Sequence, residues 1–171
     1  MMSGMFCKSG VVGCEPLREG TMSLTEESDL EDCEFCKIVA RKEPAEVVYE
    51  ATDVLAFFPL HPAALGHTLV IPKQHVRDIW ELDKNLACTV IQSVVDVSHC
   101  LRSALHPDGL NVISSAGQAA SQTIFHMHIH LVPRWDGDHI GDIWPPREPW
   151  AEEVAAEVAV RVRTACAGLA S

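Results

Sequence analysis

The chain of 171 residues is predicted to fold as an α+β domain. Hydrophobic residues make up 47% of it, which is enough for one sizeable core. Short apolar runs bounded by Gly, Pro and Asp recur along the chain and read as strands. These strand candidates follow one another in succession, while the helix candidates stand apart from them, and this order favours antiparallel pairing.

The N-terminal third contains a tail, a short helix and a hairpin. Residues 1–30 are rich in Met, Ser, Gly and acidic residues without periodicity, so we expect an acidic, disordered tail. Residues 35–42 predict a short helix that ends before Pro44. The runs at 46–50 and 54–58 predict two strands joined by an Ala-Thr-Asp turn.

The middle of the chain holds the third strand and the longest helix. Residues 67–72 predict a strand between Gly66 and the closing proline. Residues 83–105 predict a helix, because apolar residues recur there at spacings of three and four. This core-facing stripe consists of Leu86, Val90, Val94, Val97, Leu101 and Leu105. A Pro-Asp-Gly turn follows, and residues 110–116 predict a fourth strand.

Three histidines alternate with apolar residues in the sequence Phe-His-Met-His-Ile-His at 125–130. Residues 125–132 therefore predict a fifth strand, with Met127, Ile129 and Leu131 facing the core and the imidazoles on the other face. The first and third histidines would lie about 13 Å apart on a straight strand, so one ion cannot readily bind both. We expect the row to serve more than one purpose.

The last predicted element is an amphipathic helix over residues 151–167, with acids in its first turns and Arg161 and Arg163 later. The expected organisation is a tail at 1–30, one folded domain at 31–150 and a helical extension at 151–171.

The composition excludes several classes of protein. A formal net charge of −11 argues against a basic surface for nucleic acid. No apolar run of about 18 residues or signal-peptide core is present, so we expect neither a membrane span nor secretion. Seven cysteines, an odd number, are expected to stay reduced in a cytoplasmic protein.

Three segments together resemble the histidine triad (HIT) family. They are the triad "HMHIHLV", the segment "LGHTLVIPKQH" at 65–75 and the segment "SQTIFHMHIHLVPR" at 121–134. The resemblance covers residues 33–150 in the family's order. It implies a five-stranded antiparallel sheet with one long helix, commonly in a homodimer. It also implies a nucleotidyl hydrolase or transferase acting at a nucleoside α-phosphate, with a purine nucleotide, adenosine first, as the expected substrate.

The resemblance assigns roles to residues around the triad. The covalent nucleotidyl group would form on His128, and His130 would donate to a phosphoryl oxygen. His67 would orient the triad. Gln122 and Thr123 would supply dipoles near the phosphate or the leaving group; without the triad they would read as an ordinary polar loop.

A Cys-x2-Cys pair suggests a metal site. On its own this pair is weak, because it also occurs by accident or as a redox pair. Some relatives carry a structural zinc whose ligands correspond here to Cys33, Cys36, His75 and His126. Two cysteines and two histidines form a closed tetrahedral set that suits a structural ion. This assignment would spare His126 from catalysis.

Four positions bear on specificity. Pro59 stands where many relatives have an Asp or Asn that holds the ribose, so ribose recognition must rely on backbone groups or on a residue such as His61. Ser115 replaces a family Asn near the phosphate and keeps a donor and an acceptor. Trp144 precedes two prolines, and in some relatives such a tail reaches the partner subunit's active site; the alternative is a rigid connector packed on its own domain.

Three functions remain to be compared. The first is a nucleotidyl hydrolase or transferase, which the presence of His128 favours. The second is a nucleotide-binding adaptor or sensor with little turnover. The third is a zinc-dependent binding or redox module built on the cysteines. The sequence leaves open the leaving group and the preferred base.

Overall fold

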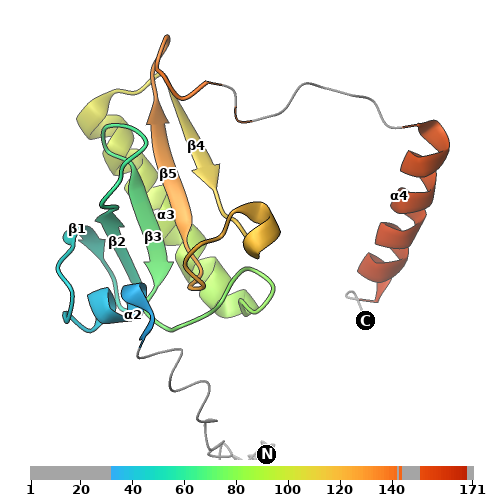
Figure 1. The fold of residues 1–171 in the computed structure, drawn as a ribbon, viewed down its shortest axis with the longest axis horizontal. Helices are drawn as coiled ribbons and strands as arrows, with labels where there is room; N and C mark the ends of the chain where they lie inside the picture. The colour runs from blue at the N-terminus through green and yellow to red at the C-terminus, as the bar shows by residue number, and fades with distance from the viewer. Residues whose placement is uncertain (1–31, 142, 144–150, 169–171) are drawn as a thin grey trace, which may run out of the picture. The chain divides into compact units, whose positions relative to one another are not determined.

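The computed structural model describes residues 32–141, 143 and 151–168. Five strands form one sheet in the order β1-β2-β3-β5-β4, and all four neighbouring pairs are antiparallel (Figure 1). The strands are β1 (Glu46–Glu50), β2 (Val54–Phe58), β3 (Thr68–Pro72), β4 (Gly109–Ile113) and β5 (Ile129–Arg134). The predicted α+β class with a five-stranded antiparallel sheet is confirmed. The expected tail at 1–30 and Trp144 lie outside the described residues.

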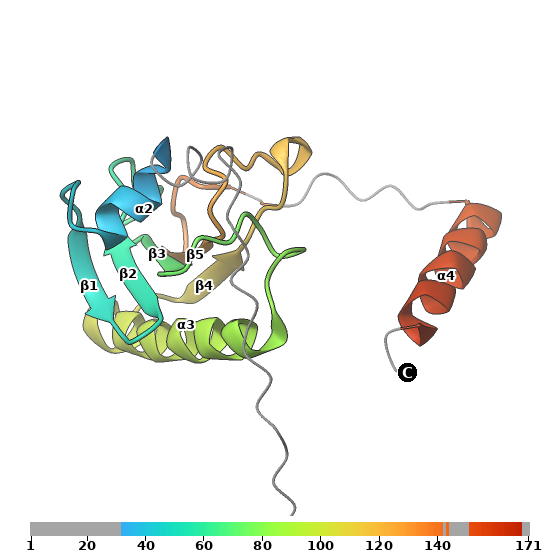
Figure 2. The same cartoon turned by 90° about the horizontal axis from the view of Figure 1, so that it is seen from below.

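The long helix α3 (Lys84–Leu105) covers one face of the sheet, and the short helix α2 (Glu34–Val39) lies on the opposite face (Figure 2). The side chain of Asp83 caps the start of α3 by accepting from the N–H groups of Asn85 and Leu86. The helix ends at His106, which adopts the left-handed conformation. The predicted helix over 83–105 therefore agrees with the structure.

Each face of the sheet has its own apolar core. On the α3 face, the predicted stripe packs on alternate residues of β2, β3 and β5, among them Val70, Ile129 and Leu131. On the α2 face, Phe35 packs on the intervening residues of β2 and β3. The second set comprises Leu55, Phe57, Leu69 and Ile71. Successive side chains of a strand point to opposite faces, and both faces of the central strands are covered, so the apolar residues form two separate cores.

The predicted fifth strand began too early. Its paired residues start at Ile129, not at 125, and continue to Arg134. Before that point the backbone leaves the sheet: the N–H of Met127 donates to the carbonyl of Val76, in the loop after β3, at 2.6 Å. The fourth strand also ends earlier than predicted, at Ile113. Residues 73–83 and 114–128 therefore lie in loops at the end of the sheet where β3 ends and β5 begins.

The described residues form two compact units, divided between Arg134 and Trp135. The second unit contains α4 (Glu152–Ala167), which agrees with the predicted C-terminal helix. The predicted boundary at residue 150 stays a prediction. Within the described part of the chain, no helix has both the length and the apolar content needed to cross a bilayer.

Candidate functional site

Three of the predicted catalytic residues, all histidines, gather on the α2 face of the sheet. His67 precedes β3, His130 lies on β5, and His128 comes just before β5. The rings of His128 and His130 have centroids 4.9 Å apart, and those of His67 and His130 are 5.1 Å apart. Phe35 of α2 meets His128 edge-on at 5.4 Å. The ring of His126 is 5.8 Å from Phe35 but belongs to a different cluster.

The hydrogen bond to the ring of His128 sets its tautomer. Its Nδ1 lies 2.6 Å from the carbonyl oxygen of His126. A carbonyl only accepts, so the proton must be on Nδ1, and Nε2 keeps a bare lone pair. Burial lowers the pKa of His128, which keeps the ring neutral. The hydroxyl of Ser114 donates to the carbonyl of His128 at 3.0 Å and holds this backbone to the end of β4.

A relay of hydrogen bonds sets the tautomer of His130. The N–H of Ala63 donates to Nδ1 of His67 at 3.0 Å, so His67 carries its proton on Nε2. That Nε2 is 2.9 Å from Nδ1 of His130 and donates to it. The proton of neutral His130 is therefore on Nε2. Burial, then the charges of His128 and His67, lowers the pKa of His130 to about 4; burial also lowers the pKa of His67.

The two rings thus present opposite functions side by side. His128 offers an unprotonated nitrogen and His130 offers an N–H. A neutral imidazole next to a fixed donor can attack an electrophilic centre and hydrogen bond to the oxygen on which charge develops.

The predicted metal ligands form a second cluster. Cys33, Cys36, His75 and His126 each place one ligand atom so that all four atoms lie within 4.8 Å of one another. Nδ1 of His126 is 3.5 Å from each sulfur, and Nδ1 of His75 is 3.2 Å from Sγ of Cys36. These distances leave room for an ion at the centre of a closed set of two sulfurs and two nitrogens.

The fully buried ring of His126 is oriented for this cluster. Its Nε2 donates to the carbonyl of Pro72 at 2.9 Å, so its Nδ1 lone pair points at the thiols. Burial lowers the pKa of His126 to about 4. Burial, then the neighbouring Cys33, raises the pKa of the Cys36 thiol to about 12. The chemistry of this donor set fits a divalent cation, which would ionise the thiols and bind the neutral imidazoles.

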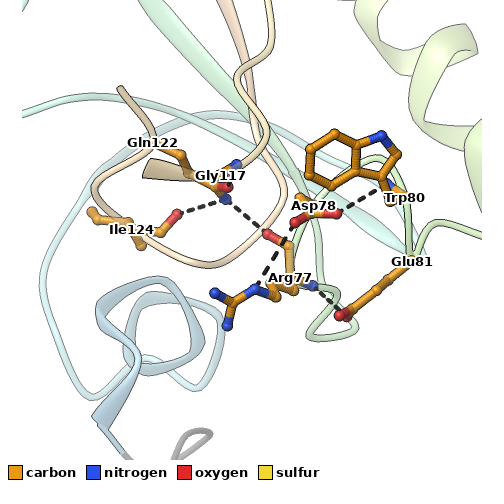
Figure 3. Close-up of polar contacts among 7 residues, drawn as sticks. All are labelled: Arg77, Asp78, Trp80, Glu81, Gly117, Gln122 and Ile124. Carbon is orange, nitrogen blue, oxygen red and sulfur yellow. Dashed lines mark hydrogen bonds and ion pairs between the residues drawn. The ribbon is translucent and has the colours of Figure 1, made fainter. Parts of the chain in front are cut away.

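Gln122 connects the loop after β3 with the loop between β4 and β5 (Figure 3). Its Oε1 accepts from the N–H of Gly117 at 2.7 Å. Its Nε2 donates to the carbonyls of Arg77 at 2.8 Å and Ile124 at 3.1 Å. The side chain is 2% exposed and its amide is fully engaged. This arrangement favours a positioning role over the predicted contact with a phosphate.

The loop after β3, which Gln122 contacts through Arg77, is stabilised by further interactions. Asp78, which is 4% exposed, accepts from the N–H of Trp80 at 2.9 Å. The guanidinium carbon of Arg77 lies 4.2 Å from the centre of the Phe125 ring. The loop that follows His75 therefore contacts the residues just before the histidine triad.

The remaining predicted positions are more open. Thr123 is exposed and Ser115 is half-buried, and both lie on the loop between β4 and β5. Pro59 is half-buried just after β2, and His61 is exposed. The amide of Ala63 and the hydroxyl of Ser114 are positioning groups that sequence reasoning missed. No local pattern indicates either one, because both act on rings brought near by the fold.

A model of the HIT domain matches residues 40–137 of the chain. The chain belongs to the HIT family. It is 40% identical over 115 residues to "Protein hit" of Bacillus subtilis, covering 67% of this chain and 79% of the relative. Its fold is similar to that of SMU.412c from Streptococcus mutans, with a TM-score of 0.74, 39% identity and coverage of 79% and 85% of the two chains.

Two further relatives of this HIT protein are named for an activity or for a bound metal. The Arabidopsis thaliana protein named adenylylsulfatase HINT3 is 32% identical over 132 residues, which are 77% of this chain and 64% of the relative. A zinc-bound HIT family protein from Mycobacterium smegmatis is 35% identical with a TM-score of 0.63, covering 69% of this chain and 86% of the relative.

Proposed function

We propose that the protein is a nucleotidyl hydrolase or transferase that forms a covalent nucleotidyl intermediate on His128. The observation that carries the proposal is the pair of opposite tautomers: His128 holds a bare Nε2 beside the N–H of His130. A nucleophile needs the first group and a pentavalent phosphoryl transition state needs the second.

The reaction would proceed in two steps. Nε2 of His128 forms a bond to the α-phosphorus, and the bond to the leaving group breaks. The electron pair stays with the leaving group, which takes up a proton from solvent water; the water that attacks in the second step returns a proton to the solvent. A water molecule, or an acceptor phosphate, then attacks the phosphorus. The phosphorus–nitrogen bond breaks, its electrons return to Nε2, and the nucleoside monophosphate or transfer product leaves.

The surrounding residues would support these steps. His130 would donate its Nε2–H to a phosphoryl oxygen, and His67 would hold that tautomer. Thr123 and Ser115 would meet the phosphate from the loop between β4 and β5. Gln122 would position this loop through its backbone partners.

We further propose that Cys33, Cys36, His75 and His126 hold a structural zinc ion. Their clustered ligand atoms and the aimed Nδ1 of His126 support this proposal. Zinc, when bound, would supply four coordinate bonds that connect α2, the loop after β3 and the segment before β5. With four protein ligands, the ion would have no coordination position open to a substrate, so its role would be to stabilise the fold.

The substrate class is a purine nucleotide derivative, with adenosine first. The relative named adenylylsulfatase supports an adenosine 5′-phosphoryl group as the part recognised. The homodimer and the cytoplasmic location expected from the sequence stay predictions.

The test is a single-turnover incubation with adenosine 5′-phosphoramidate, quenched rapidly and followed by intact-protein mass spectrometry. Wild type, His128→Ala and His99→Ala are compared, the last removing an exposed histidine of α3. The expected result is an adenylyl adduct and released AMP from wild type and His99→Ala only. Folded wild-type protein that forms neither adduct nor AMP would reject this substrate, and dinucleoside polyphosphates would be tried next.

The second candidate is a nucleotide-binding adaptor or sensor with little turnover. It would be supported by tight AMP binding without an adduct from any of these substrates. The neutral, correctly oriented His128 favours the enzyme.

A further inference from the structure

The C-terminal helix α4 has an apolar face that its own compact unit leaves uncovered. None of its residues is buried, and Val154 and Val162 are 51% and 55% exposed. At 3.6 residues per turn, most of its small apolar residues fall within an arc of about 140°. These residues are Val154, Ala155, Val158, Ala159, Val162, Ala165 and Cys166. A helix of 16 residues is marginal in water unless such a face is packed.

The charges beside this face have a distinct order. On one flank Glu157 is followed by Arg161, and on the other Glu152 is followed by Arg163. Each flank therefore has its acid in the first half of the helix and its base in the second. Among the side chains that the structure describes, no ion pair involves these four residues. In two parallel copies one flank would meet the other, so Arg161 would lie within two residues of the level of the partner's Arg163, and each Glu would lie six or more residues from an Arg. Two antiparallel copies would instead place each Glu near an Arg.

We propose that α4 pairs antiparallel with α4 of a second copy of this chain. Charge complementarity favours a second α4 as the partner. In an antiparallel pair with two-fold symmetry, each flank of one helix lies beside the same flank of the other. The register that best centres both flanks puts the axis beside Val158. Val158 then faces the partner's Val158, and Val154 faces the partner's Val162.

This register satisfies the charges and the packing together. Glu157 lies about two residues, or ~3 Å, from the level of the partner's Arg161, which is within reach of both side chains. Glu152 lies about one residue from the level of the partner's Arg163. Alanines beside the valines allow close approach of the two backbones. Exposed ion pairs contribute little affinity, so the valines would hold the pair and the charges would set its orientation.

Cysteine crosslinking in the full chain tests the proposal. The exposed thiols of Cys88, Cys100 and Cys166 are first replaced by Ser, together with the two cysteines at positions 7 and 14. Single variants Val158→Cys and Val154→Cys are then oxidised mildly. Val160→Cys is the matched control, because Val160 is 55% exposed on the opposite face of α4.

An antiparallel pair gives a specific pattern. Val158→Cys should become mostly a disulfide-linked dimer, since only the residue at the axis meets itself. Val154→Cys alone should stay at the level of Val160→Cys. A mixture of Val154→Cys chains with mass-tagged Val162→Cys chains should give the mixed disulfide. Strong self-crosslinking of Val154→Cys would mean parallel pairing, and crosslinking of every variant only at the control level would mean a different occupant; either result overturns the proposal.

A charge experiment separates pairing between chains from pairing within one helix. Glu157→Arg chains are mixed with Arg161→Glu chains, both carrying Val158→Cys. Only the mixed pair has opposite charges on this flank, so heterodimers should exceed the half expected from random pairing. A random distribution would show that the charges act only within each helix, as neighbours four residues apart can, and would reject the antiparallel charge match. Circular dichroism confirms that each variant keeps its helix.

Discussion

The two ends of the histidine row have opposite chemistry although neighbouring histidines are only two residues apart. At one end, both nitrogens of His126 are engaged inside the protein, by the carbonyl of Pro72 and by two thiols. At the other end, His128 and His130 each have one nitrogen held and the other left for a ligand. The group that reaches each ring thus differs: both nitrogens of His126 are engaged, whereas His128 keeps a bare nitrogen and His130 keeps an N–H.

Replacement of His128 should have the largest effect and should separate the two ends most clearly. Because His128→Ala removes the nucleophile, turnover of adenosine 5′-phosphoramidate should fall by about 10⁴-fold or more. The metal content should not change, because the four cluster residues remain. Steady-state kinetics and metal analysis measure both effects. Activity within tenfold of wild type would mean that another group attacks the phosphate.

At the His126 end of the row, Cys36→Ser should reduce the stability of the fold. Loss of one ligand from a closed site should lower zinc content and reduce the free energy of unfolding by several kcal/mol, on the order expected for a structural site. Denaturant unfolding and zinc stoichiometry are measured beside His128→Ala, which keeps the cluster intact. An unchanged unfolding midpoint together with metal-free wild-type protein would reject the structural zinc.

A finer test acts on the relay that prepares His130. Ala63→Pro removes the N–H that donates to His67. The rings of His67 and His130 should then each populate both tautomers, and kcat should fall by about tenfold to a hundredfold. The ring ¹⁵N shifts of His130 should report the mixed tautomer, which a merely structural defect would not produce.

The matched control for this relay is Leu65→Pro. Leu65 is 72% exposed and precedes Gly66, whose φ of +74° suits a turn with proline at the position before it. This variant should keep the wild-type kcat and ¹⁵N shifts. Equal losses in both variants would mean that loop rigidity, and not the amide of Ala63, controls His130.

The smallest effect concerns pH. Burial lowers the pKa of His67, and it lowers that of His130 to about 4, so His130 stays neutral well below pH 6.5 and His67 protonates at a lower pH than a free imidazole does. The acidic limb of kcat/KM should therefore fall below the usual imidazole value of about 6.5. Stability should decline from about pH 6.5 towards pH 4, because over this range the unfolded chain binds protons that the folded chain does not. An acidic limb at or above 6.5 would contradict the burial of these rings.

Much of the fold could be predicted because its signals are local. Spacings of three and four predicted α3, and short bounded runs predicted β1, β2 and β3 within a residue. The start of β5 could not be predicted, because the alternation of histidines with apolar residues continues where the backbone has already left the sheet. The competing partner of Met127 is the carbonyl of Val76, which is distant in sequence.

The sequence by itself determined the five strands, the long helix and the residue types of the site, since periodicity and the triad spacing are carried by neighbouring residues. The tertiary structure alone decided what each histidine can do. The groups that set the tautomers of His126 and His130 come from Pro72, from His67 and, through it, from Ala63. The amide of Gln122 likewise finds its partner in the carbonyl of Arg77, which is distant in sequence. A ring nitrogen takes its proton from the partner that reaches it, and folding selects that partner.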